Sequence, residues 1–373
     1  MKIINPFIIG RYESEEYFCN RKEEVKRLKN SVENQRNITL ISPRRLGKTG
    51  LILHFFKSLE REKDISLFYI DLMHTRNLEQ FIKTFAKAII GKFDSKTTKL
   101  IKSFGGIVRS LRPSITIDPM TGKPTIEILL QGQGSEEKSI EEIFNYLKAQ
   151  QKKIVIAFDE FQQINNYSEK SVEAILRSQI QQISNTTFIY SGSQKHMLMS
   201  MFGDHQRPFY QSTEILNLEK INRSTYKEFI TDKFVKGKFI IQSDAIDLIL
   251  DMTENHTWYV QFLCNKLYSS GNKKIDNDTV ANTLLNILKE QEVIFYNYRN
   301  LLTEHQFELL KAIASEKQVL MPTSKDFIQK YNLSAASTIK SNMDSLINKE
   351  MVFSDQEGYK VYDVFFAQWL RRF

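Results

Sequence analysis

The amino-acid sequence predicts an α/β protein with a parallel sheet, followed by a helical segment and a small C-terminal domain. Short apolar runs alternate with helical periodicity in residues 1–220, which is typical of a sheet built from crossover units. Only helical periodicity follows in residues 221–300. Residues 301–373 have the order helix, helix, turn, helix and hairpin, which predicts a winged helix-turn-helix. We therefore predict an α/β core, a helical lid and a winged helix-turn-helix.

Five apolar runs have the length and composition of buried strands. The predicted strands are Ile38–Ile41, Leu67–Asp71, Ile154–Phe158, Thr187–Tyr190 and Glu214–Leu218. The predicted helices are Lys22–Asn34, Thr49–Arg61, Leu78–Phe93, Ile140–Gln150 and Ser171–Ile183. Apolar and polar residues alternate in residues 114–130 on both sides of the turn-forming segment 118–123. This pattern predicts a β-hairpin inserted into the α/β core.

No strand is predicted between Leu218 and the C-terminal domain. The predicted lid helices are Thr225–Phe234, Ser243–Glu254, Trp258–Ser269 and Asp276–Tyr296. The elements predicted for the winged helix-turn-helix are the helices Thr303–Glu316, Thr323–Tyr331 and Ser334–Lys349 and a hairpin within Met351–Asp363. We expect Thr323 to cap the second of these helices.

The composition excludes several classes of protein. Of the 373 residues, 41% are hydrophobic and 26% are charged, so we expect neither intrinsic disorder nor a coiled-coil array. Cys19 and Cys264 are too few for a disulfide framework and suit a reducing compartment. The first residues lack the pattern of a secretory signal, and no apolar run approaches the ~20 residues that cross a bilayer. We expect a soluble, cytoplasmic protein that does not enter the membrane.

The most informative stretch is the loop after the first predicted strand. It meets the pattern G-x-x-x-x-G-K-[ST], except that Ser42 stands where the first Gly is usual. Gly47 permits the backbone to approach a phosphate, Lys48 would bridge the outer phosphates, and the Thr49 hydroxyl would ligate Mg²⁺. The residues of this predicted nucleotide site are Ser42, Pro43, Arg44, Arg45, Leu46, Gly47, Lys48 and Thr49.

A later predicted strand ends in two acids, Asp159 and Glu160. In P-loop NTPases an Asp in this position holds Mg²⁺. The Glu that follows suits a base that orients the attacking water. The two acids could instead cap the next helix, but the presence of both motifs in this order favours catalysis. We therefore predict a P-loop NTPase with Asp159 as a metal ligand and Glu160 as the catalytic base.

Three further residues are candidates for the same site. Ser191 and Ser193 end a strand expected beside that of Asp159, so either hydroxyl could contact the γ-phosphate or its water. An ordinary turn at the strand end is the alternative for both. Arg207 could neutralise transition-state charge as an arginine finger, within one chain or across subunits. A structural salt bridge is the alternative for Arg207.

Together these motifs resemble the archaeal-type P-loop ATPase family, a branch of the STAND and AAA+-like NTPases. The resemblance extends over nearly the whole chain. The segments that carry the resemblance are Asn20–Glu24, Pro43–Thr49, Tyr69–Asp71, Asp159–Glu160, Ser191–Ser193 and Asp363–Trp369. The resemblance implies ATP as the nucleotide and places Arg21, in the first segment, near the adenine. In the lid motif of the family, Asn255 and Thr257 stand here in place of the usual Gly and Pro on either side of His256.

Three functions are compatible with this pattern. The first is a slow ATPase that acts as a nucleotide-controlled molecular switch, with ATP and Mg²⁺ as cofactors. The second is a nucleic-acid-binding ATPase of the initiator or transposition type. The third is a nucleotide-binding scaffold without turnover, which the four intact residues Lys48, Thr49, Asp159 and Glu160 disfavour. We take the first as the leading hypothesis.

The distribution of charge bears on the partner. Residues 76–112 hold nine basic and two acidic residues, which account for most of the net charge of +8. Such a segment could attract a polyanion or form an ordinary solvated surface. Residues 323–363 hold five basic and six acidic residues, whereas phosphate contact needs several net positive charges. We therefore expect the winged helix to contact a protein, and DNA binding is possible but not favoured.

Overall fold

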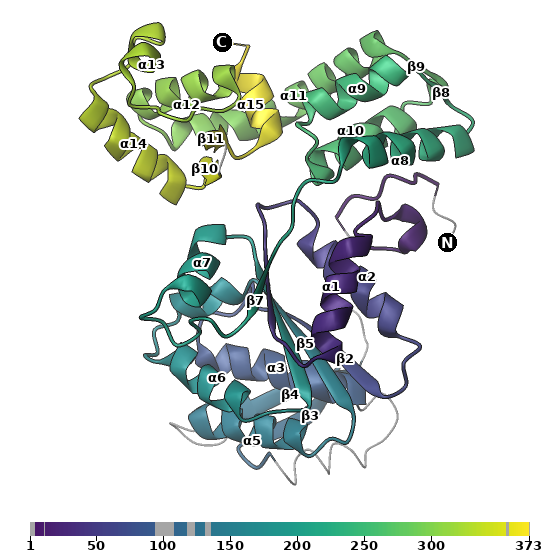
Figure 1. Ribbon diagram of the computed structural model, residues 1–373, viewed down its shortest axis with the longest axis vertical. Helices are drawn as coiled ribbons and strands as arrows, with labels where there is room; N and C mark the ends of the chain where they lie inside the picture. The colour runs from purple at the N-terminus through teal and green to yellow at the C-terminus, as the bar shows by residue number, and fades with distance from the viewer. Residues whose placement is uncertain are drawn as a thin grey trace. The chain divides into compact units, whose positions relative to one another are not determined.

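The computed structural model divides into two compact units (Figure 1). The described residues are 4–10, 12–93, 108–117, 124–130, 136–355 and 358–372. Residues 11–219 form the α/β unit, and residues 1–10 with 220–373 form the helical unit. The sequence analysis placed residues 1–10 in the α/β core, which differs from this division. Phe7 is fully buried in the helical unit, where its ring packs against Phe234 at a centroid distance of 4.9 Å.

A five-stranded parallel sheet organises the α/β unit, as predicted. Its strands are β1 (Ile38–Ile41), β2 (Ile65–Asp71), β5 (Lys153–Asp159), β6 (Thr186–Gly192) and β7 (Glu214–Asn217). Their order in space is β2-β5-β6-β1-β7. All five predicted strands are present. Because parallel strands end at the same edge, the loops after β1, β5 and β6 lie side by side there.

Helices cover both faces of the sheet (Figure 1). They are α1 (Lys22–Glu33), α2 (Lys48–Leu59), α3 (Leu78–Phe93), α5 (Glu136–Lys148), α6 (Val172–Gln181) and α7 (Lys195–Gly203). Two short 3₁₀ helices are η1 (Glu15–Tyr17) and η2 (Phe161–Asn166). Buried residues of α1 and α2 share one hydrophobic cluster with the sheet, and those of α3, α5, α6 and α7 share another. The helix α7 was not predicted.

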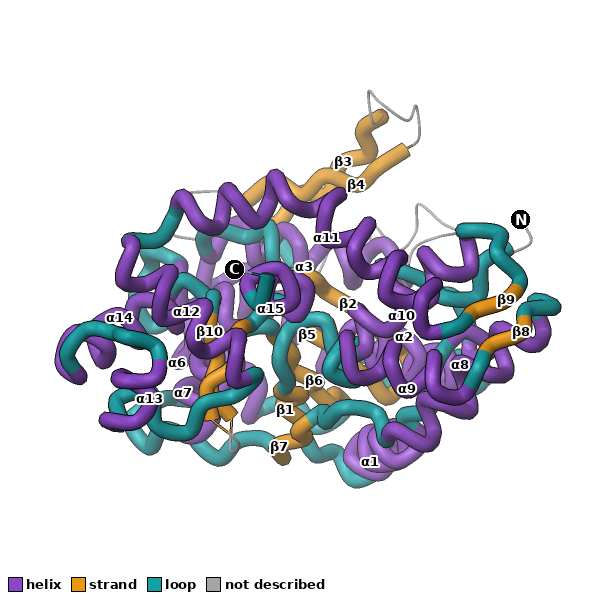
Figure 2. Tube along the Cα trace, turned by 90° about the horizontal axis from the view of Figure 1, so that it is seen from above, coloured by secondary structure: helices purple, strands orange, loops and turns teal. Residues whose placement is uncertain are grey.

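The predicted hairpin between β2 and β5 is present. Strands β3 (Leu111–Ile117) and β4 (Pro124–Leu130) pair antiparallel, and Figure 2 shows them projecting from the α/β unit. The predicted turn 118–123 lies outside the described residues. So do residues 94–107, which carry Lys96, Lys99 and Lys102 of the basic segment.

The first part of the helical unit contains four helices and two very short strands. The helices are α8 (Arg223–Lys236), α9 (Ser243–Met252), α10 (Thr257–Ser269) and α11 (Asn277–Asn300). The prediction that no strand follows Leu218 before the C-terminal domain is wrong, because β8 (Ile240–Ile241) pairs in parallel with β9 (Lys274–Ile275). Within the described residues, no helix combines the length and apolarity needed to cross a bilayer.

The last part has the element order of a winged helix-turn-helix. Its elements are α12 (Glu304–Glu316), α13 (Lys325–Lys330), α14 (Ala336–Asn348), β10 (Val352–Asp355), β11 (Gly358–Val361) and α15 (Val364–Leu370). Val319 forms an additional bridge to Tyr359 of β11. The predicted cap of α13 is wrong by one residue, because the Ser324 hydroxyl accepts from the Phe327 N–H. The division of the helical unit near residue 300 stays a prediction.

Candidate active site

The loop between β1 and α2 forms one wall of the site. Arg45 and Gly47 have positive φ angles of 64° and 94°, so the chain turns sharply before α2 begins at Lys48. The Lys48 side chain folds back along this loop and is buried, with 7% of the residue exposed. Its Nζ donates to the Ser42 carbonyl, the Ser42 hydroxyl and the Pro43 carbonyl, each at 3.1 Å. The loop thus positions the Lys48 ammonium group beside the place where the sequence predicts a bound phosphate.

The environment of Lys48 favours an anionic ligand. Burial lowers the pKa of the Lys48 ammonium to about 8, against the opposing attraction of Glu160 and Asp159. The nearby Arg44 lowers this pKa further. A bound phosphate would supply negative charge next to Nζ and so stabilise its protonated form. The site is therefore electrostatically suited to a nucleotide.

The Asp159 carboxylate joins four parts of the α/β unit. Its Oδ2 accepts from the Thr49 hydroxyl of α2 and the Tyr69 hydroxyl of β2, both at 2.7 Å. Its Oδ1 accepts from the Ser191 hydroxyl of β6 and from the Glu160 N–H, the latter at 3.1 Å. Burial and the charge of Asp159 raise the pKa of Tyr69 far above its usual value, which keeps Tyr69 a hydrogen-bond donor. These contacts fix the carboxylate next to the start of α2.

The donor set at Asp159 fits magnesium. The Thr49 hydroxyl and the Asp159 carboxylate are adjacent hard oxygen ligands, which Mg²⁺ prefers. Across the described ranges, no group of three or more His, Cys, Asp or Glu side chains could form an all-protein metal cage. Magnesium in nucleotide sites takes one or two protein ligands and completes its shell with phosphates and water. Thr49 and Asp159 match that arrangement.

Glu160 is held in place by three hydrogen bonds to one oxygen. Its Oε2 accepts from the Ser193 N–H at 3.2 Å, the Ser193 hydroxyl at 2.8 Å and the Gln162 amide at 2.5 Å. The Glu160 backbone has a positive φ of 55°, which turns the chain from β5 into η2. The two predicted serines therefore bind the two acids, Ser191 on Asp159 and Ser193 on Glu160. Their contact with a phosphate stays a prediction.

Sequence reasoning assigned no role to two residues that contact the acids. Tyr69 lies in one of the segments that carry the family resemblance, yet nothing in the sequence indicated that its hydroxyl reaches Asp159. Gln162 lies in η2 and belongs to no motif. The only signal was position, since Gln162 follows Glu160 by two residues.

Arg21 braces the phosphate loop. It is 4% exposed and stands before α1 with a positive φ of 75°. Its Nη1 donates to the Glu24 carboxylate and to the Glu219 carbonyl, both at 2.7 Å, and its Nη2 donates to the Leu46 carbonyl at 3.3 Å. Arg21 thus connects the phosphate loop to the last residue of the α/β unit. The predicted contact with adenine stays a prediction.

Replacing Arg21 with Ala is expected to lower the free energy of unfolding by about 2 kcal/mol, because the buried Leu46 carbonyl, the Glu219 carbonyl and the Glu24 carboxylate lose a charged donor. The urea unfolding midpoint and the Kd for ATP measure this, and we expect weaker ATP binding as well. Arg27→Ala is the matched control, since Arg27 lies on α1, the helix that follows Arg21, and is half exposed. Equal midpoints for the two variants would contradict the bracing role.

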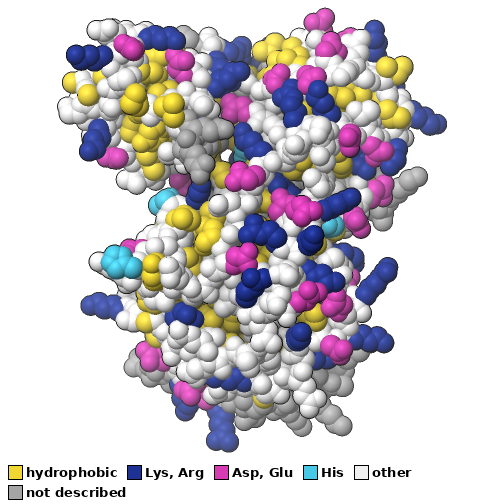
Figure 3. All heavy atoms as spheres, in the orientation of Figure 1, with side chains coloured by type: hydrophobic (Ala, Val, Ile, Leu, Met, Phe, Trp, Pro, Cys, Tyr) yellow, Lys and Arg dark blue, Asp and Glu magenta, His cyan; other side chains and the backbone are white. Residues whose placement is uncertain are grey.

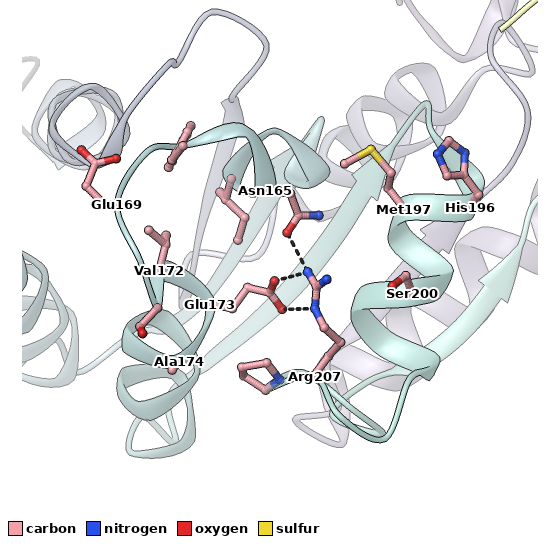
Figure 4. Close-up of a pocket in the computed structure, with 13 residues that line it drawn as sticks. Asn165, Glu169, Val172, Glu173, Ala174, His196, Met197, Ser200 and Arg207 are labelled. Carbon is pink, nitrogen blue, oxygen red and sulfur yellow. Dashed lines mark hydrogen bonds and ion pairs between the residues drawn. The ribbon is translucent and has the colours of Figure 1, made fainter. Parts of the chain in front are cut away.

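Arg207 lies apart from this cluster. Its guanidinium pairs with Glu173 of α6 and donates from Nη2 to the Asn165 side chain at 2.7 Å (Figure 4). These residues line a cavity of about 600 Å³. Among the described residues, no hydrogen bond connects Arg207 to Lys48 or Glu160. Within one chain, this ion pair agrees with the structural salt bridge that was the alternative role for Arg207. A role of Arg207 as an arginine finger stays a prediction.

Comparison with known protein families identifies the unit that holds these residues. Residues 18–238, more than half of the chain, match the family described as an ATPase domain predominantly from Archaea. The chain belongs to this ATPase family. Residues 293–372 of the ATPase match a family described as a probable winged helix domain. Both matches confirm the resemblance found in the sequence.

Solved structures confirm the fold of this ATPase. It is similar to the Walker-type ATPase of Pyrococcus abyssi, with a TM-score of 0.66, 17% identity, and coverage of 98% of this chain and 99% of the other. It is also similar to the ORC2 protein of Aeropyrum pernix, solved as ADPNP-ADP complexes, with a TM-score of 0.60, 12% identity, and coverage of 98% and 95%. No curated protein is similar enough in sequence to count as a relative.

Proposed function

We propose that this ATPase is a molecular switch that binds ATP with Mg²⁺ and hydrolyses it slowly. The observation that carries the proposal is the state of Glu160. Lys48, Thr49 and Asp159 are already assembled, whereas the carboxylate expected to activate water is held by Ser193 and Gln162. A site of this kind is suited to bind nucleotide readily and to turn it over slowly.

Different residues would bind the phosphates and the magnesium ion. Lys48 would exchange its bonds to Ser42 and Pro43 for the outer phosphates, and the N–H groups at the start of α2 would face the same anion. Thr49 and Asp159 would hold Mg²⁺, which neutralises negative charge on the phosphates when it is bound.

Glu160 would act on the water. Its carboxylate would accept a proton from the attacking water, whose oxygen forms a bond to the γ-phosphorus while the bond from that phosphorus to the leaving oxygen breaks. The products are ADP and phosphate. Ser191 and Ser193 hold the two acids through their hydroxyls, so both serines support this arrangement.

A continuous set of contacts supports coupling to the helical unit. Arg21 binds both the Leu46 carbonyl of the phosphate loop and the Glu219 carbonyl, and the next residue, Lys220, begins the helical unit. Within that unit, Lys220 donates to the Glu254 carbonyl at 2.8 Å. A change in the phosphate loop on loss of the γ-phosphate would therefore be transmitted through Arg21 to Glu219 and Lys220, where the chain passes into the helical unit.

Charge favours a protein as the partner of the winged helix. The exposed residues of α14 include Ser337, Thr338 and Ser341, with Lys340 and Asp344 as a balanced pair of charges. On the face shown in Figure 3, basic and acidic side chains are interspersed over both units. A surface that binds a nucleic-acid backbone concentrates Lys and Arg instead.

The test is Mg²⁺-dependent ATP hydrolysis by the purified protein, with and without duplex DNA, together with limited proteolysis near residue 220 in ATP and in ADP. We expect slow hydrolysis that DNA leaves unchanged, and a cleavage rate that differs between the two nucleotides. Hydrolysis strongly stimulated by DNA would favour the nucleic-acid ATPase. Identical cleavage in ATP and ADP would contradict a switch.

A further inference from the structure

Gln162 is a buried polar side chain at the site to which the proposed reaction gives no chemical role. It is 4% exposed and lies in η2, two residues after Glu160. Its Nε2 donates to Glu160 Oε2 at 2.5 Å. Its Oε1 is buried and has no hydrogen-bond partner among the described residues. The amide is therefore satisfied only on the side that faces Glu160.

Gly192 provides the space for this amide. A Cβ atom at Gly192 would lie 1.8 Å from Gln162 Oε1 and 2.9 Å from its Cδ, so a side chain there would displace Gln162. Gly192 does not have a positive φ angle, so its backbone conformation does not require glycine. The need for glycine at this position comes from the Gln162 side chain. Gly192 also links Ser191 to Ser193, the two serines that bind the acids.

The balance of interactions holds the Gln162 side chain only weakly in this position. One hydrogen bond to a carboxylate holds the amide in place, while the buried Oε1 without a partner has an unfavourable free energy. The two contributions are opposite in sign and similar in size. Gln162 can therefore exchange its contact with Glu160 for another when the site changes.

We propose that Gln162, seated on Gly192, is a latch that holds Glu160 at rest and limits the rate of ATP hydrolysis. The proposal rests on the proposed role of Glu160 as the base. Gln162 and Ser193 direct three donors at one carboxylate oxygen, Oε2, so this oxygen is already occupied and is not available to a water molecule. Gln162 is a positioning residue, because it acts through Glu160.

Gln162→Met tests the latch, because it keeps the size of the side chain and removes the donor. We expect kcat to rise about tenfold, the effect of losing one hydrogen bond to a charged group. We expect the KM for ATP to stay unchanged, since Gln162 has no proposed contact with nucleotide. Gly192→Ala should give the same rise by displacing the amide, and the double variant should show no further increase.

Gln163→Met is the matched control. Gln163 is the neighbouring glutamine in η2, and its amide donates to the Thr75 carbonyl at 3.0 Å. This variant should keep the wild-type kcat. A thermal melt and the Kd for ATP of each variant show whether the site is folded.

Two outcomes would overturn the latch. One is a kcat for Gln162→Met at or below the wild-type value with ATP binding intact, and the other is additive effects of Gln162→Met and Gly192→Ala. Glu160→Gln distinguishes the proposed role of Gln162 as a latch from the proposed role of Glu160 as the base. If Glu160→Gln stops turnover and Gln162→Met does not accelerate it, the latch is wrong and the base assignment stands. If Glu160→Gln hydrolyses ATP normally, both are wrong.

Discussion

Glu160→Gln is expected to lower kcat for ATP hydrolysis by about a hundredfold to ten-thousandfold, the usual contribution of a general base. The amide has the shape of the carboxylate, and its oxygen can still accept from Ser193 and Gln162. ATP binding should therefore be preserved. Single-turnover hydrolysis and the Kd for a fluorescent ATP analogue measure the two effects separately.

Glu169→Gln is the control for Glu160→Gln. Glu169 belongs to the same unit, and its carboxylate accepts from the Leu78 N–H rather than facing the phosphate loop. This variant should hydrolyse ATP at the wild-type rate. Normal turnover by Glu160→Gln would show that another group activates the water.

Lys48→Ala is expected to weaken ATP binding by about a hundredfold or more. Lys48 supplies the buried positive charge of the phosphate loop, and a charge-assisted hydrogen bond to an anion contributes about 1.5–3 kcal/mol. Hydrolysis should fall below detection at ATP concentrations that saturate the wild type. Isothermal calorimetry with ATP, with and without Mg²⁺, measures the loss.

Lys57→Ala is the matched control for Lys48→Ala. Lys57 lies on the same helix, α2, but it is exposed and pairs with Glu60 at 2.7 Å. Its loss should change neither ATP binding nor hydrolysis. Equal ATP affinities for the two variants would refute the phosphate site.

The regular parts of the fold could be predicted from the sequence because their signals are local. The strand Ile38–Ile41 and the helix Leu78–Phe93 have the predicted limits. The strands β8 and β9 were missed because two residues are too few to show alternation, and each depends on its partner elsewhere in the chain. The helix α7 was missed because it has only nine residues, of which Leu198, Met201 and Phe202 are buried.

The part of the candidate site that could be predicted from the sequence consists of residues at the ends of strands. Thr49 and Asp159 meet because β1 and β5 both flank β6 in a parallel sheet, a juxtaposition that the two motifs predict together. The contact of Gln162 with Glu160 could not be predicted, because it depends on a turn with positive φ and on the space over Gly192. Neither is visible in a residue pattern.

The position of β1 in the sheet has a consequence for how the protein is made. β1 pairs only with β6 and β7, whereas its sequence is synthesised first of the five strands. At about 5–20 residues per second, the ribosome needs on the order of ten to thirty seconds to travel from Ile41 to Asn217. Until the ribosome has passed Gly192, the nascent chain carries an apolar strand with neither neighbour available, and β7 completes the set only at Asn217. The phosphate loop that follows β1 must therefore acquire its shape late, and this interval is when the growing polypeptide is most exposed to aggregation and most dependent on chaperones.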